Sequence, residues 1–348
     1  CEGDDPPPPE EKNRPTTVAE YNQVTEGLKD YYDKDAFFAI GAAIEPSSLD
    51  KPAEVALLKR HFASITAENV MKWSTIQPAE GNFNFGPADR LVTFAQANGI
   101  IVYGHTLCWH NQVPDWVFRD GNGPASKELV LQRLRTHITT VMTHFKGKVY
   151  GWDVVNEAID DGSATYKNNN WYQACGSDYI FEAFETAREA DPSVKLFYND
   201  YSATNATKRE KIYTLLSELK AQNLVDGMGL QGHWNINDPS DDLISAAFNR
   251  YKSLGVELRI TELDVSIYPN SSDPQGEYTS DIALKQAIAY GRFFRLFRQY
   301  KDDITGVTTW GMADNHTWLD NFPVTGRKNY PLLFDINLVP KQAYFTVI

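Results

Sequence analysis

Short apolar stretches alternate with longer amphipathic stretches along most of this chain. The short stretches are apolar at consecutive positions, which is typical of strands that a parallel sheet buries on both faces. Polar residues or glycines close these stretches, and each strand is expected to end there. The predicted carboxyl ends of the strands lie near Gly41, Ala67, Thr106, Asn156, Asp200, His233, Glu262 and Gly311.

The longer stretches carry apolar residues at helical spacing, as Leu131, Leu134 and Ile138 do. This periodicity predicts helices over Pro52–Phe62, Pro87–Asn98, Lys127–Phe145, Tyr179–Ala190, Ala206–Gln222, Asp241–Ser253 and Asp281–Tyr300. A further amphipathic helix is predicted over residues 17–35, packed outside the main body. Eight strands that alternate with helices indicate an α/β fold, a single (β/α)8 TIM barrel with parallel strands. The competing open, doubly wound sheet normally carries a glycine-rich phosphate loop after its first strand, and residues 39–43 (AIGAA) do not match one.

Residues 1–16 differ in composition from the barrel predicted over 17–348, because they are acidic, rich in proline and poor in apolar residues. Such a segment cannot bury apolar surface, so we expect a flexible tether. Cys1 resembles the first residue of a mature bacterial lipoprotein, which is acylated there, and the acidic residues after it resemble a surface-export signal of the Bacteroidetes. On this resemblance the chain is exported and held by a lipid on Cys1 at the outer-membrane surface. The alternative is a secreted or periplasmic protein and a boundary that falls at a cysteine by chance.

Composition excludes some classes of partner. The 42% apolar content suffices for a large core, and the net charge of −13 argues against nucleic acid as a partner. No apolar run reaches the roughly 18 residues that a membrane span needs. The 8 Trp and 18 Tyr suit a protein that stacks on sugars, although most are expected in the core. A monomer is the default expectation.

The cysteines and histidines show no metal-ligand spacing, so neither a catalytic metal nor a cofactor is expected. Cys108 lies in an apolar segment and is predicted to be a buried free thiol, while a disulfide between Cys108 and Cys175 is left open.

Two glutamates, Glu157 and Glu262, stand at the carboxyl ends of predicted strands. They are 105 positions apart (262 − 157), and a strand-helix unit of a typical barrel takes roughly 31 residues. Three such units and some insertion assign them to the fourth and seventh strands. Active sites of such barrels lie at this end, and two carboxylates that meet there can cleave a glycosidic bond.

Other polar and aromatic residues follow the predicted strands as well. Each has an ordinary alternative: a single glutamate can be a loop residue, His105 a core histidine, Lys72 a solvated charge, and Trp310 a core aromatic. A polar cluster at so many strand ends costs stability unless its members are paired, which favours a functional reason for it. Amides, charges and aromatic rings together can bind sugar hydroxyls and sugar faces.

Four blocks carry a resemblance to a known family. They are Glu-Asn-x-Met-Lys-Trp at 68–73, Gly-His-Thr-Leu-x-Trp-His at 104–110, Trp-Asp-Val-Val-Asn-Glu at 152–157 and Thr-Glu-Leu-Asp at 261–264. In kind, order and strand assignment they resemble glycoside hydrolase family 10, the endo-β-1,4-xylanases, over residues 25–348. The resemblance implies a retaining endo-β-1,4-xylanase that binds xylan and xylo-oligosaccharides and works through a covalent glycosyl-enzyme intermediate.

The same resemblance implies a role for each matching residue. Glu157 would be the general acid/base and Glu262 the nucleophile, supported by His233, Asp264 and Asn156. The residues implied to bind substrate are Glu68, Asn69, Lys72, His105, Trp109, Gln112, Tyr201, Gln231, Trp310 and Trp318. The chain departs from the family pattern at Ser202 and at Leu319, which puts contacts at the cleft rim in doubt.

Two other functions compete with this interpretation. One is a retaining glycosidase for another β-glycan, such as cellulose or mixed-linkage glucan. The other is a non-catalytic glycan-binding lipoprotein, against which the presence of both glutamates argues.

Overall fold

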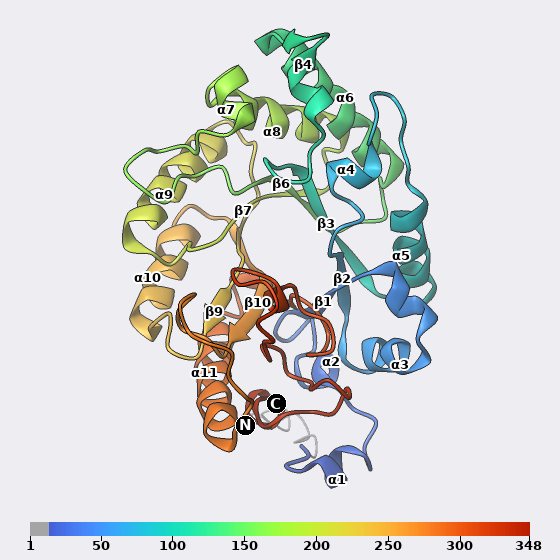
Figure 1. Cartoon of the computed structure of the whole chain (residues 1–348), viewed down its shortest axis with the longest axis vertical. Coiled ribbons are helices and arrows are strands. Elements are labelled where there is room, and N and C mark those ends of the chain that lie inside the picture. Colours follow the sequence, from blue (N-terminus) through green and yellow to red (C-terminus); the bar gives the residue numbers. More distant parts are fainter. Residues whose placement is uncertain (1–13) are drawn as a thin grey trace, which may run out of the picture.

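The computed structural model describes residues 14–348, so Cys1 and most of the predicted tether lie outside the described residues. The predicted boundary between residues 16 and 17 stays a prediction. Within the described residues, parallel strands form the centre of the molecule and helices surround them (Figure 1). The barrel strands are β1 (Ala39–Ile44), β2 (Ser64–Ala67), β3 (Ile101–Cys108), β6 (Gly151–Asn156), β7 (Lys195–Asp200), β8 (Gly227–Leu230), β10 (Glu257–Ser266) and β11 (Ile304–Thr309).

These strands close into a barrel. Each pairs in parallel with its neighbours in the order β1-β2-β3-β6-β7-β8-β10-β11, and β11 pairs with β1, where Gly306 lies opposite Ala39. An open doubly wound sheet has two free edges, so the closure excludes that alternative and confirms the predicted TIM barrel. A short strand, β9 (His233–Asn235), adds to the outer part of β10, and β4 (Arg119–Asp120) and β5 (Gly123–Pro124) form a small hairpin.

The helices of the barrel match the predicted ones to within one residue at each end. They are α3 (Pro52–His61), α5 (Gly86–Ala97), α6 (Lys127–His144), α8 (Asp178–Ala190), α9 (Ala206–Ala221), α10 (Asp241–Lys252) and α11 (Ser280–Gln299). Side chains of Ser126, Asn205, Ser240 and Thr279 cap the amino ends of four of them. The shorter elements are α1 (Val18–Tyr21), α2 (Leu28–Tyr31), η1 (Pro46–Asp50), α4 (Trp73–Ile76), η2 (Asp115–Phe118), α7 (Asn170–Cys175), η3 (Trp318–Asp320) and α12 (Gln342–Val347).

The predicted helix over residues 17–35 is wrong, because only α1 and α2 form there. Arg60 of α3 donates hydrogen bonds to the backbone carbonyls of Tyr21 and Glu26. These two carbonyls therefore accept tertiary hydrogen bonds from α3. Gly27 passes so close to α3 that a Cβ there would lie 2.1 Å from the Arg60 carbonyl oxygen. The chain bends to follow α3 at this point, and helical periodicity alone does not reveal such a contact.

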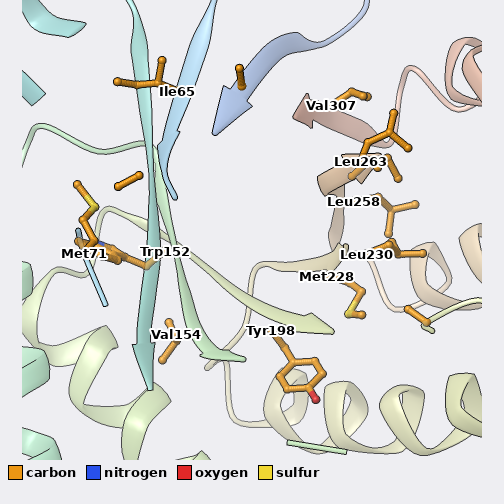
Figure 2. Packing of buried hydrophobic residues seen from close by; sticks show 14 of the residues in the cluster. Ile65, Met71, Trp152, Val154, Tyr198, Met228, Leu230, Leu258, Leu263 and Val307 are labelled. Atoms are coloured by element: carbon orange, nitrogen blue, oxygen red, sulfur yellow. The ribbon is translucent and has the colours of Figure 1, made fainter. Parts of the chain in front are cut away.

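A continuous hydrophobic cluster joins the strands to the surrounding helices. Figure 2 shows part of it, including Ile65 of β2, Trp152 of β6 and Leu258 of β10. A second set of side chains fills the barrel itself. The guanidinium of Arg259 on β10 lies 4.5 Å from the ring centroid of Tyr103 on β3, and these strands are not neighbours, so the contact crosses the interior.

Cys108 and Cys175 are both buried free thiols, so the disulfide between them does not form. Among residues 14–348, no helix is long and apolar enough to cross a membrane.

Candidate active site

A cleft of about 620 Å³ opens at the carboxyl ends of the barrel strands. It is lined by Lys72, His105, Trp109, His110, Asn111, Gln112, Asn156, Glu157, Lys167, Tyr201, Ser202, Gln231, His233, Glu262, Trp310, Trp318 and Phe322. Both predicted glutamates are on these walls, as are the other predicted site residues except Glu68, Asn69 and Asp264.

Glu262, on β10, is almost completely buried and accepts a hydrogen bond at each oxygen. His233 Nε2 lies 2.9 Å from its Oε1, and Asn199 Nδ2 lies 2.9 Å from its Oε2. Burial alone would raise the pKa of Glu262, but the His233 hydrogen bond and the nearby His105 and Lys72 outweigh it and lower the pKa from 4.5 to about 2. Glu262 is therefore a carboxylate across the neutral range.

His233 holds a proton next to this carboxylate. Its Nδ1 lies 2.9 Å from Asp264 Oδ1, so both ring nitrogens face a carboxylate. Burial favours the neutral ring, but Asp264 and Glu262 reverse this and raise the pKa of His233 from 6.5 to about 10. Asp264 in turn accepts a hydrogen bond of 2.9 Å from Trp318 Nε1. Asp264, which the family resemblance implies to support Glu262, thus contacts it through His233.

Glu157 directly follows β6 and has a left-handed backbone, with φ of 60°. Its amide N donates to the Asn199 carbonyl oxygen at 2.9 Å, which fixes this unusual conformation. Its Oε2 accepts hydrogen bonds from Gln231 Nε2 at 2.8 Å and from Asn156 Nδ2 at 3.3 Å. Within residues 14–348, the side-chain donors to Glu157 are thus all neutral amides, whereas Glu262 receives a charged one.

Asn199, which is not among the predicted site residues, connects the two glutamates. Its Nδ2 lies 3.0 Å from Asn156 Oδ1 as well as 2.9 Å from Glu262. Thr261 donates to Asn199 Oδ1 at 2.6 Å, so the amide group has one orientation. Gly229 leaves the room for it, since a Cβ there would lie 2.5 Å from Asn199 Oδ1.

Lys72 lies on the part of the cleft wall that follows β2, with its ammonium 4.9 Å from the ring centroid of Trp109. It donates to Asn69 Oδ1 at 3.0 Å and to Gln112 Oε1 at 3.2 Å. Burial lowers the pKa of Lys72, although Glu262 and other carboxylates oppose this. Asn69, which is half-buried, thus holds the Lys72 ammonium in place without itself lining this cleft.

Glu68 is buried and does not line this cleft either. Its Oε2 lies 2.8 Å from His316 Nε2, a contact that sequence reasoning missed, and this hydrogen bond raises the pKa of His316. His105 is on the wall, and its Nδ1 lies 2.7 Å from Asp153 Oδ2 inside the barrel. The predicted residues at 68–72 and 105 therefore belong to one side of the cleft, but only some of them are exposed to it.

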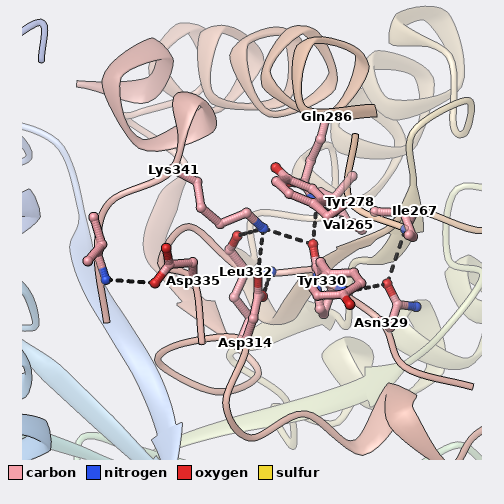
Figure 3. Close-up of polar contacts among 12 residues, drawn as sticks. Val265, Ile267, Tyr278, Gln286, Asp314, Asn329, Tyr330, Leu332, Asp335 and Lys341 are labelled. Carbon is pink, nitrogen blue, oxygen red and sulfur yellow. Dashed lines mark hydrogen bonds and ion pairs between the residues drawn. The ribbon is translucent and has the colours of Figure 1, made fainter. Parts of the chain in front are cut away.

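Three aromatic rings, Trp310, Trp318 and Phe322, line the cleft beyond β11. Phe322 stacks on Trp318 with 4.7 Å between ring centroids and was not predicted, because its loop has no regular pattern. The chain after these rings is fixed by a buried polar network (Figure 3). There, Lys341 contacts Asp314 at 2.8 Å and donates to the Leu332 carbonyl oxygen.

The wall next to Glu157 carries Tyr201 and Lys167, whose ammonium lies 4.4 Å from the Tyr201 ring centroid. Lys167 and its neighbour in the cleft, His110, were not predicted as site residues. Within residues 14–348, no group of three or more His, Cys, Asp or Glu side chains is placed to hold a metal ion.

A closed (β/α)8 barrel with a carboxylate pair in an open, aromatic-lined cleft defines the class of glycoside hydrolases. Residues 27–348 match the sequence model of Glycosyl hydrolase family 10, and the chain belongs to this family.

Similar proteins cover nearly the whole barrel. The chain is 48% identical to endo-1,4-beta-xylanase B of Paenibacillus barcinonensis over 316 residues, which are 89% of this chain and 95% of that protein. It is 47% identical to an endo-1,4-beta-xylanase of Geobacillus stearothermophilus, with 92% and 97% covered. A crystal structure of a P. barcinonensis xylanase with a conduramine derivative superimposes with a TM-score of 0.89 at 46% identity, covering 94% and 98%. A mutant structure in complex with xylotriose has a TM-score of 0.90 at 44% identity, covering 93% and 99%.

Proposed function

We propose that this chain is a retaining endo-β-1,4-xylanase that hydrolyses internal β-1,4-xylosidic bonds of plant xylan. The single observation that carries the proposal is that the two carboxyl groups in the cleft have different hydrogen-bond partners. Glu262 is held ionised by His233 at 2.9 Å, while Glu157 faces the neutral amide of Gln231 at 2.8 Å. Double displacement requires one ionised carboxylate as the nucleophile and a second carboxyl group that acts first as acid and then as base. The relatives reported above bear the name xylanase, which supports xylan as the substrate.

In the first step, Glu262 acts as the nucleophile and Glu157 as the general acid. A Glu262 carboxylate oxygen forms a bond to the anomeric carbon while the bond from that carbon to the glycosidic oxygen breaks. The electron pair goes to the glycosidic oxygen, which takes the proton of Glu157 and leaves as an alcohol. The products of this step are a glycosyl ester on Glu262 and an ionised Glu157.

In the second step, water replaces the ester. Glu157 takes a proton from a water molecule, whose oxygen forms a bond to the anomeric carbon as the bond to Glu262 breaks. Glu262 becomes a carboxylate again and Glu157 regains its proton. Two inversions at the same carbon give net retention.

Asn156 contributes to both steps through the sugar 2-hydroxyl. Its Oδ1 accepts hydrogen bonds from Asn199 and Gln231, so its Nδ2 remains to donate toward the cleft, beside Glu157. A hydrogen bond to this hydroxyl strengthens as positive charge develops on the sugar ring.

The remaining wall residues bind xylan. Lys72, with Gln112 at 3.2 Å, and His105 offer hydrogen bonds on one side, and Trp109, Trp310 and Trp318 offer apolar faces. In this proposal the aromatic walls fit xylose and exclude the hydroxymethyl group of glucose by their shape. In this proposal Glu68 and Asn69 act mainly by holding their neighbours, and Tyr201 and Gln231 face the sugar near Glu157.

The test is a comparison of reducing-sugar release from xylan, cellulose and mixed-linkage glucan by the parent, Glu157→Ala and Glu262→Ala. We expect short xylo-oligosaccharides from xylan with the parent and a loss of about 10²–10⁴-fold or more in each variant. Faster cleavage of a glucan would assign the enzyme to another β-glycan. Binding to xylan without any release would indicate a glycan-binding protein.

We further propose that the protein is exported and carries a lipid on Cys1, followed by an acidic tether. The acidic, proline-rich composition of residues 2–11 supports a tether. Membrane fractionation of the full precursor and its Cys1→Ala variant tests the anchor, since equal release of both proteins into the medium would contradict it. The expected monomer is tested by light scattering after gel filtration.

A further inference from the structure

A buried lysine beneath the cleft, Lys208, has no part in the steps above. It comes from α9, which is not one of the motif-bearing segments, and its side chain is almost completely buried. Its ammonium lies 2.9 Å from Asp200 Oδ1 at the end of β7 and 2.8 Å from Asp161 Oδ1 in the segment after β6. Lys208 therefore joins the two chain segments that flank Glu157.

A short chain of hydrogen bonds leads from this ion pair to Glu157. The Tyr198 hydroxyl accepts hydrogen bonds from the amides of Ala158 at 3.0 Å and Ile159 at 3.2 Å, and it donates its own proton to Asp200 Oδ2. Since Asp200 takes that proton, both lone pairs of the hydroxyl are directed at the two amides. The peptide groups after Glu157 are thus fixed, directly after a residue whose left-handed φ of 60° costs energy.

The same ion pair holds Tyr201 on the cleft wall. The Tyr201 amide donates to Asp200 Oδ1 at 2.9 Å, its hydroxyl donates to Asp161, and the Lys208 ammonium lies 3.5 Å from its ring centroid. Asp200 is completely buried, so without Lys208 its charge would have no cationic partner among these contacts. A buried carboxylate that loses its partner takes up a proton or moves.

We propose that Lys208 is a positioning residue for the general acid, and that it acts through Asp200 and Tyr198 on the backbone that carries Glu157. The proposal rests on the acid/base role proposed for Glu157. Lys208 does not touch the sugar or the reacting atoms. Lys208 instead affects the position of the Glu157 carboxyl group relative to the leaving oxygen. A shift of about 1 Å in such a group can cost about 10²-fold in rate.

The test uses two substrates whose leaving groups differ strongly in their need for an acid: phenyl and 2,4-dinitrophenyl β-xylobioside. A dinitrophenolate leaves without protonation, whereas a phenolate needs it. The measured quantity is kcat/KM, which reports the steps up to the first departure of the leaving group. Both substrates carry the same xylobiosyl group and an aromatic leaving group, so comparing their kcat/KM values separates a loss of acid catalysis from a loss of binding at the Tyr201 wall.

For Lys208→Met we expect a loss of about 30-fold on the phenyl glycoside and of less than about threefold on the dinitrophenyl glycoside. Lys208→Arg, which keeps the charge, restores most of the loss. Lys211→Met is the matched control: Lys211 is on the same helix and donates to the carbonyls of Asp160, Gly162 and Ala164 in the same segment, but it has no contact with Asp200. We expect the control to change both values by less than about threefold.

Tyr198→Phe is a second route to the same result, since it removes the hydroxyl that orients the two amides and keeps the ring. It serves where Lys208→Met does not fold, and the same dependence on the leaving group is expected. Equal losses on both substrates, or no loss, in these variants would overturn the proposal. A parent that cleaves neither xylobioside would instead overturn the proposed function.

Discussion

The charge on Glu262 depends chiefly on His233, and removing His233 should change the acidic limb of the pH profile. A pKa of about 2 in place of 4.5 corresponds to roughly 3 kcal/mol in favour of the carboxylate, since tenfold in an ionisation constant is about 1.4 kcal/mol. His233→Ala removes the hydrogen bond at 2.9 Å and the positive charge with it. The burial of Glu262, which raises its pKa, then dominates, although Lys72 and Asn199 still oppose it.

We therefore expect the acidic limb of kcat/KM to move from below about pH 3 in the parent to roughly pH 5 or above in His233→Ala. Below the new limb, kcat/KM falls tenfold for each pH unit, because a protonated Glu262 cannot attack. The assay uses the dinitrophenyl glycoside, so that the proton on Glu157 does not limit the rate. His316→Ala is the control, since His316 contacts Glu68 and should leave the limb in place. An unchanged limb in His233→Ala would refute the reasoning.

Three further predictions follow from buried charges. Lys341→Met leaves Asp314 without the ion pair at 2.8 Å, so urea unfolding at pH 7 should show a stability lower by about 3–5 kcal/mol; an unchanged midpoint contradicts this. Asn199→Ala removes a hydrogen bond to a charged oxygen of Glu262, and kcat/KM on xylan should fall about 10–100-fold, with KM little affected. The pKa of His233 is raised from 6.5 to about 10, so its proton contributes fully to stability below pH 6.5. This contribution is lost as the pH rises through 10, and urea titrations at pH 6 and pH 10 measure the loss.

The parts of the fold that follow local rules could be predicted from the sequence. Strand ends at Ala67, Asn156 and Asp200 coincide with the observed ends of β2, β6 and β7, because a polar cluster follows a buried run directly. The sixth strand was extended too far, to His233. It ends at Leu230, and Gly232, at a φ of 78°, turns the chain before the short β9. The pairing of β9 with β10 also carries β10 beyond Glu262 to Ser266.

The site was predictable only where a residue belongs to a motif. Asn199 is an ordinary turn former by type, and its importance comes from a contact across strands that spacing does not reveal. Lys167 and Phe322 are on irregular segments whose course depends on tertiary contacts. Lys208 is a helix residue that the amphipathic pattern assigns to no function, and only the folded chain brings it to Asp200.

The most direct test of the double-displacement mechanism is to trap its intermediate. A 2-deoxy-2-fluoro-β-xylobioside with a dinitrophenyl leaving group destabilises the positive charge that develops on the ring and slows both steps, while the good leaving group keeps the first step faster than the second. We expect peptide mass spectrometry to find one added 2-deoxy-2-fluoroxylobiosyl group, attached to Glu262. A label on another residue, or steady hydrolysis that gives the inverted product and no label, would contradict the account.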